Sequence, residues 1–146
     1  MLKLSTKGRY GVRLMVDLAQ HYGKGPVVLK DVGRRQDISV KYLEHLIVPL
    51  KKAKLIRATR GARGGYVLFN PPGSVTLRDI ISAVEGGVCL VECTKSPAVC
   101  RRSGICLSRS AWSDISKKIS ETLESFTLEQ ILSRGTKNEE IITYSI

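Results

Sequence analysis

The sequence predicts a mainly helical fold that carries one small β-hairpin. Three observations support this fold class. Most of the chain shows apolar residues at helical spacing, two short apolar runs flank a glycine-rich turn at residues 61–65, and a long helical stretch follows a segment that holds all four cysteines. The hairpin falls within the first group of helices, and the long helix lies near the end of the chain.

The charge of the chain is strongly segregated. At 146 residues it has the size of one domain, or of one small domain with an extension, and it can bury a core without disulfide bonds. Its net charge of +11 comes from residues 1–66, which hold 15 Lys and Arg against 4 Asp and Glu, while residues 67–146 hold 9 of each sign. Such an excess is typical of nucleic-acid binding, because Lys and Arg neutralise phosphates. The alternative is a basic face that only aids solubility.

The first helices are predicted from apolar spacing and from their end signals. Helical spacing predicts a helix over residues 6–22 and a short second helix over about 29–36. A third helix is predicted over about 40–52, with Ser39 as its N-cap because a serine hydroxyl can accept from an unpaired backbone N–H. Pro49 predicts a local irregularity within this helix.

A hairpin and a fourth helix complete the first part of the chain. Short strands are expected over 55–59 and 66–69, joined by the glycine-rich turn at 61–65. Thr76 is the predicted cap of a helix over about 77–84.

The second part begins with the cysteines. Residues 88–106 show neither a helical nor a strand period and are expected to form a loop. A long helix is predicted over about 107–126, Thr127 then restarts a short helix through Leu132, and the tail 133–146 is expected to be disordered or to form an edge strand. The apolar residues of the long helix step by three and four, as in a coiled-coil seam. This seam consists of Trp112, Ile115, Ile119, Leu123 and Phe126.

The order helix, short helix, tight turn, helix, hairpin is that of a winged helix–turn–helix. In such a fold the helix after the turn enters the major groove of DNA with its N-terminal residues toward the bases. The candidate contacts there are Ser39, Lys41, Tyr42 and Glu44. Glu44 could accept a hydrogen bond from a cytosine amino group, or it could stay in solvent as an ion pair with Lys41.

The hairpin tip and the first helix are expected to hold the DNA backbone. Arg60 and Arg63 lie among small residues that allow close approach to a phosphate, and Arg can reach into a minor groove. A plain hairpin with exposed arginines is the alternative. Thr6, Lys7 and Arg9 are candidates for contacts that position phosphates.

Four segments resemble the IscR/NsrR/CymR family of winged-helix transcription regulators, also called the Rrf-two family. The segments are KLSTKGRY at 3–10, SVKYLE at 39–44, RGARGGY at 60–66 and AVEG at 83–86. They follow the family order over nearly the whole chain. The resemblance implies a homodimer that binds double-stranded DNA, in which the long helix is the dimerisation helix.

The resemblance also implies a use for the thiols. Cluster-binding members carry three cysteines at similar intervals, and a cluster of the 2Fe–2S type is the expected cofactor. The matching residues are Cys93, Cys100 and Cys106. In IscR-type members a His follows the third cysteine by three residues, where this chain has Arg109, a poor ligand because it stays protonated. The fourth ligand is therefore open, with Cys89 and the partner subunit's Asp17 as candidates.

Other uses of the cysteines remain open at this stage. Four thiols could form a zinc site, although no CxxC pair is present. Cluster-free thiols could sense oxidation, and a CymR-like regulator acts without a cluster through a partner enzyme or a single thiol. A metal-dependent enzyme is disfavoured because no Ser/His/Asp set, phosphate loop or carboxylate pair accompanies the cysteines. A cluster carrier would leave the basic segment without a role, so we expect a regulator and not an enzyme.

The expected organisation has four parts. These are a DNA-binding domain over 1–86, a sensor loop over 87–106, a dimerisation helix with a short terminal helix over 107–132, and a tail over 133–146. No apolar run is long enough to cross a membrane, and the first residues lack an apolar signal core. We therefore expect a cytoplasmic protein that does not bind membranes.

Overall fold

The computed structural model describes residues 2–144. Within this range the chain forms seven α-helices, two 3-10 helices and one antiparallel hairpin, and none of these helices is long and apolar enough to cross a membrane. In chain order the elements are α1 (Thr6–Gln20), α2 (Leu29–Gln36), α3 (Val40–Lys52), β1 (Ile56–Thr59), β2 (Gly65–Leu68), η1 (Pro72–Ser74), α4 (Leu77–Glu85), α5 (Glu92–Lys95), η2 (Pro97–Val99), α6 (Leu107–Glu124) and α7 (Leu128–Tyr144).

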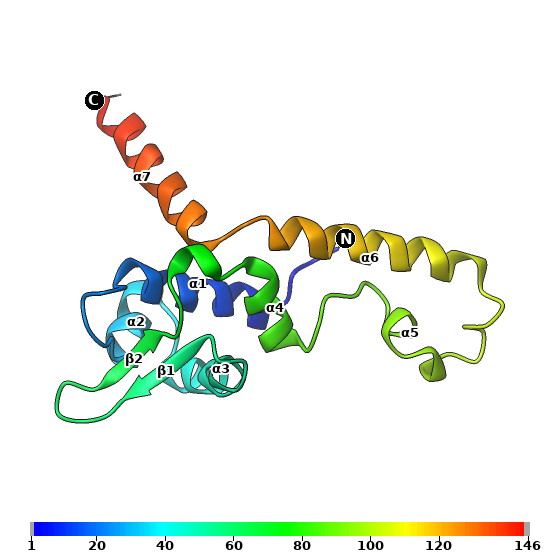
Figure 1. The fold of residues 1–146 in the computed structure, drawn as a ribbon, viewed down its shortest axis with the longest axis horizontal. Helices are drawn as coiled ribbons and strands as arrows, with labels where there is room; N and C mark the ends of the chain where they lie inside the picture. Colours follow the sequence, from blue (N-terminus) through cyan, green and yellow to red (C-terminus); the bar gives the residue numbers. More distant parts are fainter. Residues whose placement is uncertain (1, 145–146) are drawn as a thin grey trace.

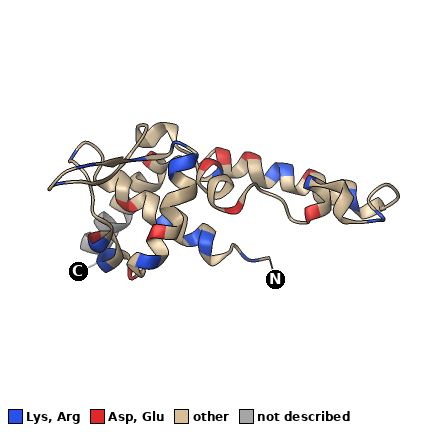
Figure 2. Cartoon of the chain, turned by 90° about the horizontal axis from the view of Figure 1, so that it is seen from below, with Lys and Arg blue, Asp and Glu red and all other residues tan. Residues whose placement is uncertain are grey.

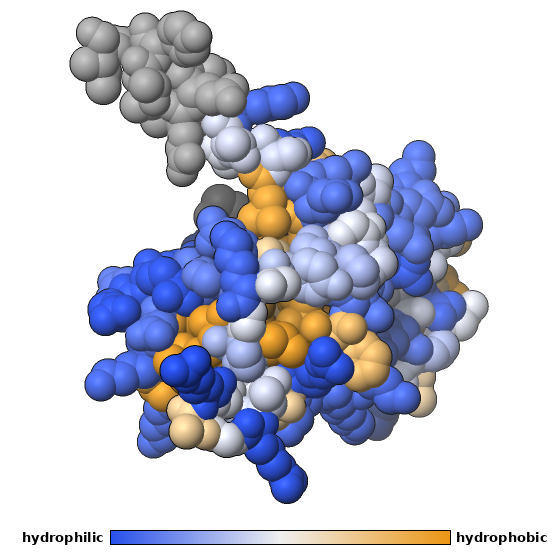
Figure 3. All heavy atoms as spheres, turned by 60° about the vertical axis from the view of Figure 1, so that its left-hand side comes forward, coloured by the Kyte–Doolittle hydropathy of each residue, from blue (hydrophilic) through white to orange (hydrophobic). Residues whose placement is uncertain are grey.

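The molecule consists of a lobe and an arm. The lobe contains α1–α4 and the hairpin, and α6 extends from it as the arm (Figure 1). α5 and its flanking loop lie beside the outer part of α6, while α7 leaves the lobe in another direction. Hydrophilic side chains surround a small apolar area on the face of the lobe seen in Figure 3. The mainly helical fold with a two-stranded hairpin confirms the predicted fold class.

An apolar core holds the lobe together. Leu14 and Met15 from α1, Leu43 and Leu46 from α3, and Ile80 from α4 are at most 1% exposed. Burying a side chain of this size stabilises the fold by roughly 1.5–3 kcal/mol. The helical stripes of the sequence therefore become the helix faces that meet in this core.

The start of α7 also belongs to the core of the lobe. Leu128 is fully buried there. The backbone N–H of Leu128 donates to the carbonyl of Val75, and the N–H of Leu77 donates to the carbonyl of Phe126, both at 2.9 Å. The junction between α6 and α7 is thus fastened to the segment before α4, which anchors the inner end of the arm.

The predicted helix caps are present. The hydroxyl of Ser39 accepts from the N–H of Tyr42 at 3.2 Å and starts α3. Thr76 and Asp79 form a reciprocal capping box at the start of α4, with distances of 2.9 and 3.1 Å between backbone nitrogens and side-chain oxygens. Between α2 and α3 the chain turns at Asp37, which has a left-handed backbone with φ of 52°.

The hairpin is pinned to the lobe at its base. Val27, before α2, exchanges two backbone hydrogen bonds with Tyr66 at 2.9 and 2.8 Å. A Cβ at Gly65 would lie 2.5 Å from the carbonyl oxygen of Val27, and one at Gly64 would lie 2.4 Å from that of Thr59. These glycines are therefore required because backbone passes directly over them.

Two predictions from the sequence are wrong. The cysteine segment is not a plain loop, since it contains α5 and η2, which are too short to show a period in the sequence. The tail is neither disordered nor an edge strand over 133–144, because α7 runs through it; its last two residues lie outside the described range. Thr127 does begin this helix as predicted, exchanging hydrogen bonds with Gln130 at 3.0 and 3.2 Å, and the helix then continues through mostly polar residues.

Candidate nucleic-acid interface and sensor loop

The N-terminal half of α3 offers an exposed polar surface. Ser39, Lys41 and Glu44 are exposed, while Tyr42 is half-buried. The ring of Tyr42 meets the ring of Tyr10 on α1 edge-on, with centroids 5.5 Å apart, so α1 holds it in place. Within the described residues the ion pairs do not include Lys41 with Glu44, which leaves the Glu44 carboxylate open to solvent or DNA.

The hairpin tip and the start of α1 are the other two predicted contact regions. Arg60 and Arg63 are exposed at the tip, and Figure 2 shows Lys and Arg along the hairpin and the neighbouring helices. Thr6, Lys7 and Arg9 are exposed on the first turns of α1, where the Arg9 guanidinium donates to the Thr6 hydroxyl at 3.2 Å. All the predicted contacts thus lie on the lobe, and α1 packs against both α3 and β2.

The thiols lie along the segment between α4 and α6. Cys89 is exposed, whereas the other three cysteines are half-buried, and all four are free thiols. Their chemistry fits an iron–sulfur cluster, because thiolates are its usual ligands. Within the described residues, however, no three His, Cys, Asp or Glu side chains lie close enough to hold a metal ion. The segment thus has suitable donors that do not converge in this conformation.

This segment is tied to both of its neighbouring helices. The Arg109 guanidinium, on the first turn of α6, donates to the carbonyl of Cys93 at 2.9 Å. Further along α6, the Ser116 hydroxyl accepts from the N–H of Leu90 at 3.0 Å. Lys95 donates to the carbonyl of Gly86 at the end of α4. Arg109 therefore supports the backbone of the loop.

Cys106 has the most distinctive environment of the four thiols. It is the N-cap residue of α6, and its sulfur lies 3.3 Å from the hydroxyl of Ser108. This hydrogen bond, followed by the backbone N–H of Arg109 and the nearby charge of Arg102, lowers the pKa of Cys106. The thiolate is both the metal ligand and the nucleophile, so Cys106 is the thiol best prepared for either role.

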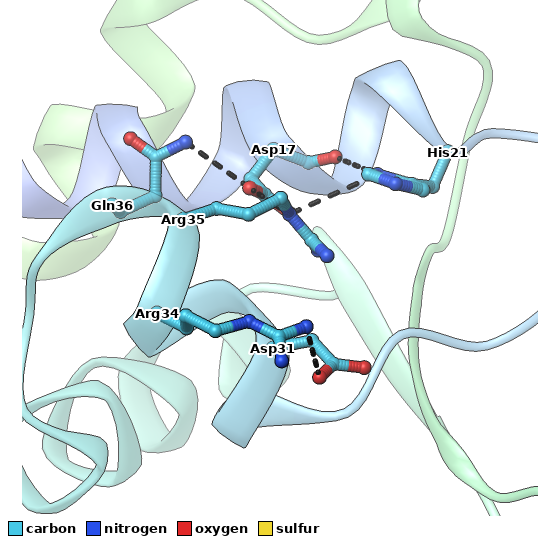
Figure 4. Close-up of polar contacts among 6 residues, drawn as sticks. All are labelled: Asp17, His21, Asp31, Arg34, Arg35 and Gln36. Atoms are coloured by element: carbon cyan, nitrogen blue, oxygen red, sulfur yellow. Dashed lines mark hydrogen bonds and ion pairs between the residues drawn. The ribbon is translucent and has the colours of Figure 1, made fainter.

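Asp17 was a candidate fourth ligand, and the structure places it elsewhere. Its side chain is fully buried in the lobe, where Arg35 donates to both carboxylate oxygens at 2.7 and 3.0 Å and Gln36 donates at 3.1 Å (Figure 4). Burial alone would raise the pKa of Asp17, but the hydrogen bonds from Arg35 and Gln36 and the charges of Arg35 and His21 lower it overall. Ligation by Asp17 would require breaking this buried ion pair.

Comparison with known proteins identifies the family. A family model named Rrf2 and described as an iron-dependent transcriptional regulator matches residues 4–134. The chain belongs to the Rrf2 family. The resemblance predicted from the four segments is thereby confirmed, and the chain is a DNA-binding transcription regulator.

Individual members of the Rrf2 family match nearly the full length of the chain. The protein rrf2 of Nitratidesulfovibrio vulgaris is 40% identical over 131 residues, which are 90% of this chain and 87% of that protein. CymR of Bacillus subtilis is 37% identical over 145 residues, 99% of this chain and 100% of CymR. Its solved structure, described as that of the global cysteine regulator, has a TM-score of 0.74 at 40% identity and covers 92% of this chain and 98% of that one.

A solved structure of IscR from T. potens is equally similar. It has a TM-score of 0.75 and 42% identity, and covers 92% of this chain and 88% of that one. The fold therefore resembles both an IscR and a CymR, and it favours neither of them.

Sequence reasoning missed two features of the lobe. It assigned Leu128 to the dimerisation segment, whereas Leu128 is part of the lobe's core. It also offered Asp17 as a ligand in the partner subunit, whereas Asp17 is paired with Arg35 and Gln36 inside its own lobe. The signal for the buried ion pair was present, because Asp17 falls between Leu14 and Leu18 on the apolar stripe of α1, where a charge needs a partner.

Proposed function

We propose that this chain is a homodimeric, non-catalytic transcription regulator of the cytoplasm whose affinity for DNA is controlled at the cysteine segment. The observation that supports the dimer is that the α6 seam is not fully covered by its own chain. Its outer residues are exposed, and Ile119, Leu123 and Phe126 are half-buried. Trp112 and Ile115 are each 40% exposed, and the only buried residue of α6 is Ser116. Large apolar side chains on one stripe of an arm indicate a surface that another chain covers.

DNA contact is assigned to three parts of the lobe. The first turns of α3 would enter the major groove with Ser39, Lys41, Tyr42 and Glu44. The hairpin tip, through Arg60 and Arg63, and the start of α1, through Thr6, Lys7 and Arg9, would hold the backbone. The proposed domains follow the predicted division, except that the start of α7 is grouped with the DNA-binding lobe because of Leu128.

Binding of duplex DNA at varied salt tests these assignments. The duplex is one selected from random sequences by the wild-type protein. Replacing both Arg60 and Arg63 with Ala should lower the salt slope by about two, one for each lost phosphate contact. The matched control replaces the exposed Arg101 and Arg102 with Ala, which removes the same charge from the cysteine segment. Equal slopes for the two double variants would contradict the assignment of the hairpin tip.

Control at the cysteines is proposed to depend on an iron–sulfur cluster. Cys93, Cys100 and Cys106 would hold it, and it would supply a centre that changes with iron supply or oxidation. Arg109 would keep the loop backbone in place through the carbonyl of Cys93 without acting as a ligand. Cys89 is the remaining thiol and is exposed, so it is either dispensable or the fourth ligand.

Visible absorption and bound iron after anaerobic reconstitution test the cluster. Serine at any of the three ligand positions should abolish both signals, and serine at Cys89 should have a smaller effect. A wild-type protein that holds no iron would favour the second candidate, a cluster-free regulator controlled by thiol oxidation. That candidate draws its support from the lowered pKa of Cys106 and from thiols that do not converge.

A further inference from the structure

One face of α1 carries polar residues that hold the end of α2. Tyr10, Arg13 and Asp17 lie at intervals of three and four, which places them on one side of the helix. Arg13 donates to the backbone carbonyl of Gln36 and lies over the Tyr10 ring, 5.2 Å from its centroid. The Asp17 carboxylate accepts hydrogen bonds from the side chains of both Arg35 and Gln36. The last two residues of α2 are thus held from α1 by side chains and backbone together.

The contact with Arg35 is a two-point contact. One guanidinium donates through Nε at 3.0 Å and through Nη2 at 2.7 Å, each to a different oxygen of Asp17 (Figure 4). Such a pair fixes the orientation of the planar groups as well as their distance. The Asp17 side chain is fully buried, while that of Arg35 is 34% exposed. The carboxylate therefore has a fixed place in the lobe, and the arginine is held against it.

Apolar packing alone defines the orientation of α2 poorly. The helix has eight residues, of which Leu29 and Val32 are buried. Both lie in its first half, whereas Arg35 and Gln36 lie at its end. The next buried apolar residue is Ile38, in the turn after α2. Without the contacts from α1, the end of α2 would be held mainly through this turn, which would leave the orientation of its last residues poorly defined.

The end of α2 determines where α3 begins. After Gln36 the chain turns at Asp37 and Ile38, and Ser39 already caps α3. Such a short turn transmits a rotation of α2 directly to the first turn of α3. That turn carries the residues proposed to face the bases.

We propose that Asp17 is a positioning residue for operator recognition. Its side chain is fully buried in the lobe and is not placed to reach DNA, yet it fixes the end of α2 and so sets the position of the first turn of α3. A buried ion pair adds little net stability compared with apolar residues of the same volume, and the best reason for one here is orientation. The inference rests on the proposed role of α3 in base contact.

The test separates orientation from stability. Asp17→Asn removes the charge at constant size, and Val84→Ala, in the core of α4, serves as a control that lowers stability elsewhere in the lobe. The DNA affinities of both variants are measured at a temperature at which their thermal melts show that the proteins are fully folded. Asp17→Asn should reduce the preference for the selected operator over random duplex by about tenfold and leave random-duplex affinity within about twofold. Val84→Ala should leave both quantities unchanged.

A second pair of variants keeps the proposal testable if Asp17→Asn does not fold. Arg35→Lys retains the positive charge but cannot make the two-point contact, so it should lose operator preference as well. The double variant Asp17→Asn with Arg35→Gln offers a neutral hydrogen-bonded pair and should recover part of that preference. A folded Asp17→Asn or Arg35→Lys protein with wild-type operator preference would overturn the proposal, as would an equal loss in Val84→Ala. A wild-type protein with no operator preference would instead contradict the role of α3.

Discussion

The lobe and the arm of this molecule differ in how they bury apolar residues. Of the 19 buried apolar residues in the core of the described chain, Leu128 alone lies beyond residue 86. α6 has 18 residues, and the only buried one is a serine. Leu107 and Ile105 at the outer end of the arm are 93% and 72% exposed. The lobe thus completes its own core, whereas the arm presents side chains that remain to be covered.

This difference indicates a division of roles. A DNA-binding surface must be rigid, and the lobe supplies caps, a pinned hairpin and buried contacts. A sensor must change, and the cysteine segment is held mainly by a few polar contacts such as those of Arg109 and Ser116. Elements with few buried contacts are the ones that rearrange at low cost.

The largest expected effect comes from placing a charge on the arm. Ile119→Asp would bury an unpaired carboxylate in the proposed dimer seam, at a cost of about 3–5 kcal/mol to association. Light scattering should then report a monomer, while circular dichroism remains unchanged because no side chain of α6 belongs to the core of the lobe. Ser110→Asp introduces the same charge at an exposed position on the opposite side of α6 and should stay dimeric. A wild-type protein with the mass of a monomer would refute the assignment of the α6 seam as the dimer interface.

The next effect tests whether the start of α7 belongs to the lobe. Leu128→Ala removes a fully buried side chain and should lower the free energy of unfolding by about 2–5 kcal/mol. Leu107→Ala makes the same change at the exposed start of α6 and should alter stability little. Urea denaturation measures the free energy of unfolding of both variants. Equal stabilities would mean that Leu128 contributes to the arm and not to the core.

A smaller effect is expected at the base of the hairpin. Gly65→Ala would place a Cβ 2.5 Å from the carbonyl of Val27, so the hairpin must move away from the lobe. DNA affinity should fall by about tenfold, as expected when positioned backbone contacts are displaced. Ala62→Ser at the exposed tip is the control. Unchanged affinity of Gly65→Ala would show that the hairpin does not need this attachment.

The smallest effect is the pH dependence contributed by Asp17. Its folded-state pKa is lowered from the ordinary value of 3.8, so its ionised form stabilises the fold above that value. The stabilisation is lost as the pH falls through the folded-state pKa. The stability difference between wild type and Asp17→Asn should therefore be constant near neutral pH and shrink below about pH 4. A stability difference that increases as the pH falls would contradict a lowered pKa of Asp17.

Local signals in the sequence were sufficient for the lobe. The stripe of α3, the caps at Ser39 and Thr76 and the glycine-rich hairpin each depend on a few neighbouring residues, and all are present in the structure. The part of α7 beyond Leu132 was missed because its mostly polar residues show no apolar stripe. The partner of Asp17 was missed because it lies 18 positions away, and pairing at that separation is decided by how α1 and α2 pack.

The most direct test compares DNA affinity between states of the cysteine segment. Wild type is measured on its selected operator as the iron-loaded, the reduced metal-free and the oxidised protein. A variant with serine at Cys93, Cys100 and Cys106 is measured after the same treatments. Control at the cysteine segment predicts that the affinity of wild type differs by at least about tenfold between two of these states and that the variant shows no such difference. Equal wild-type affinity in all three states would contradict it.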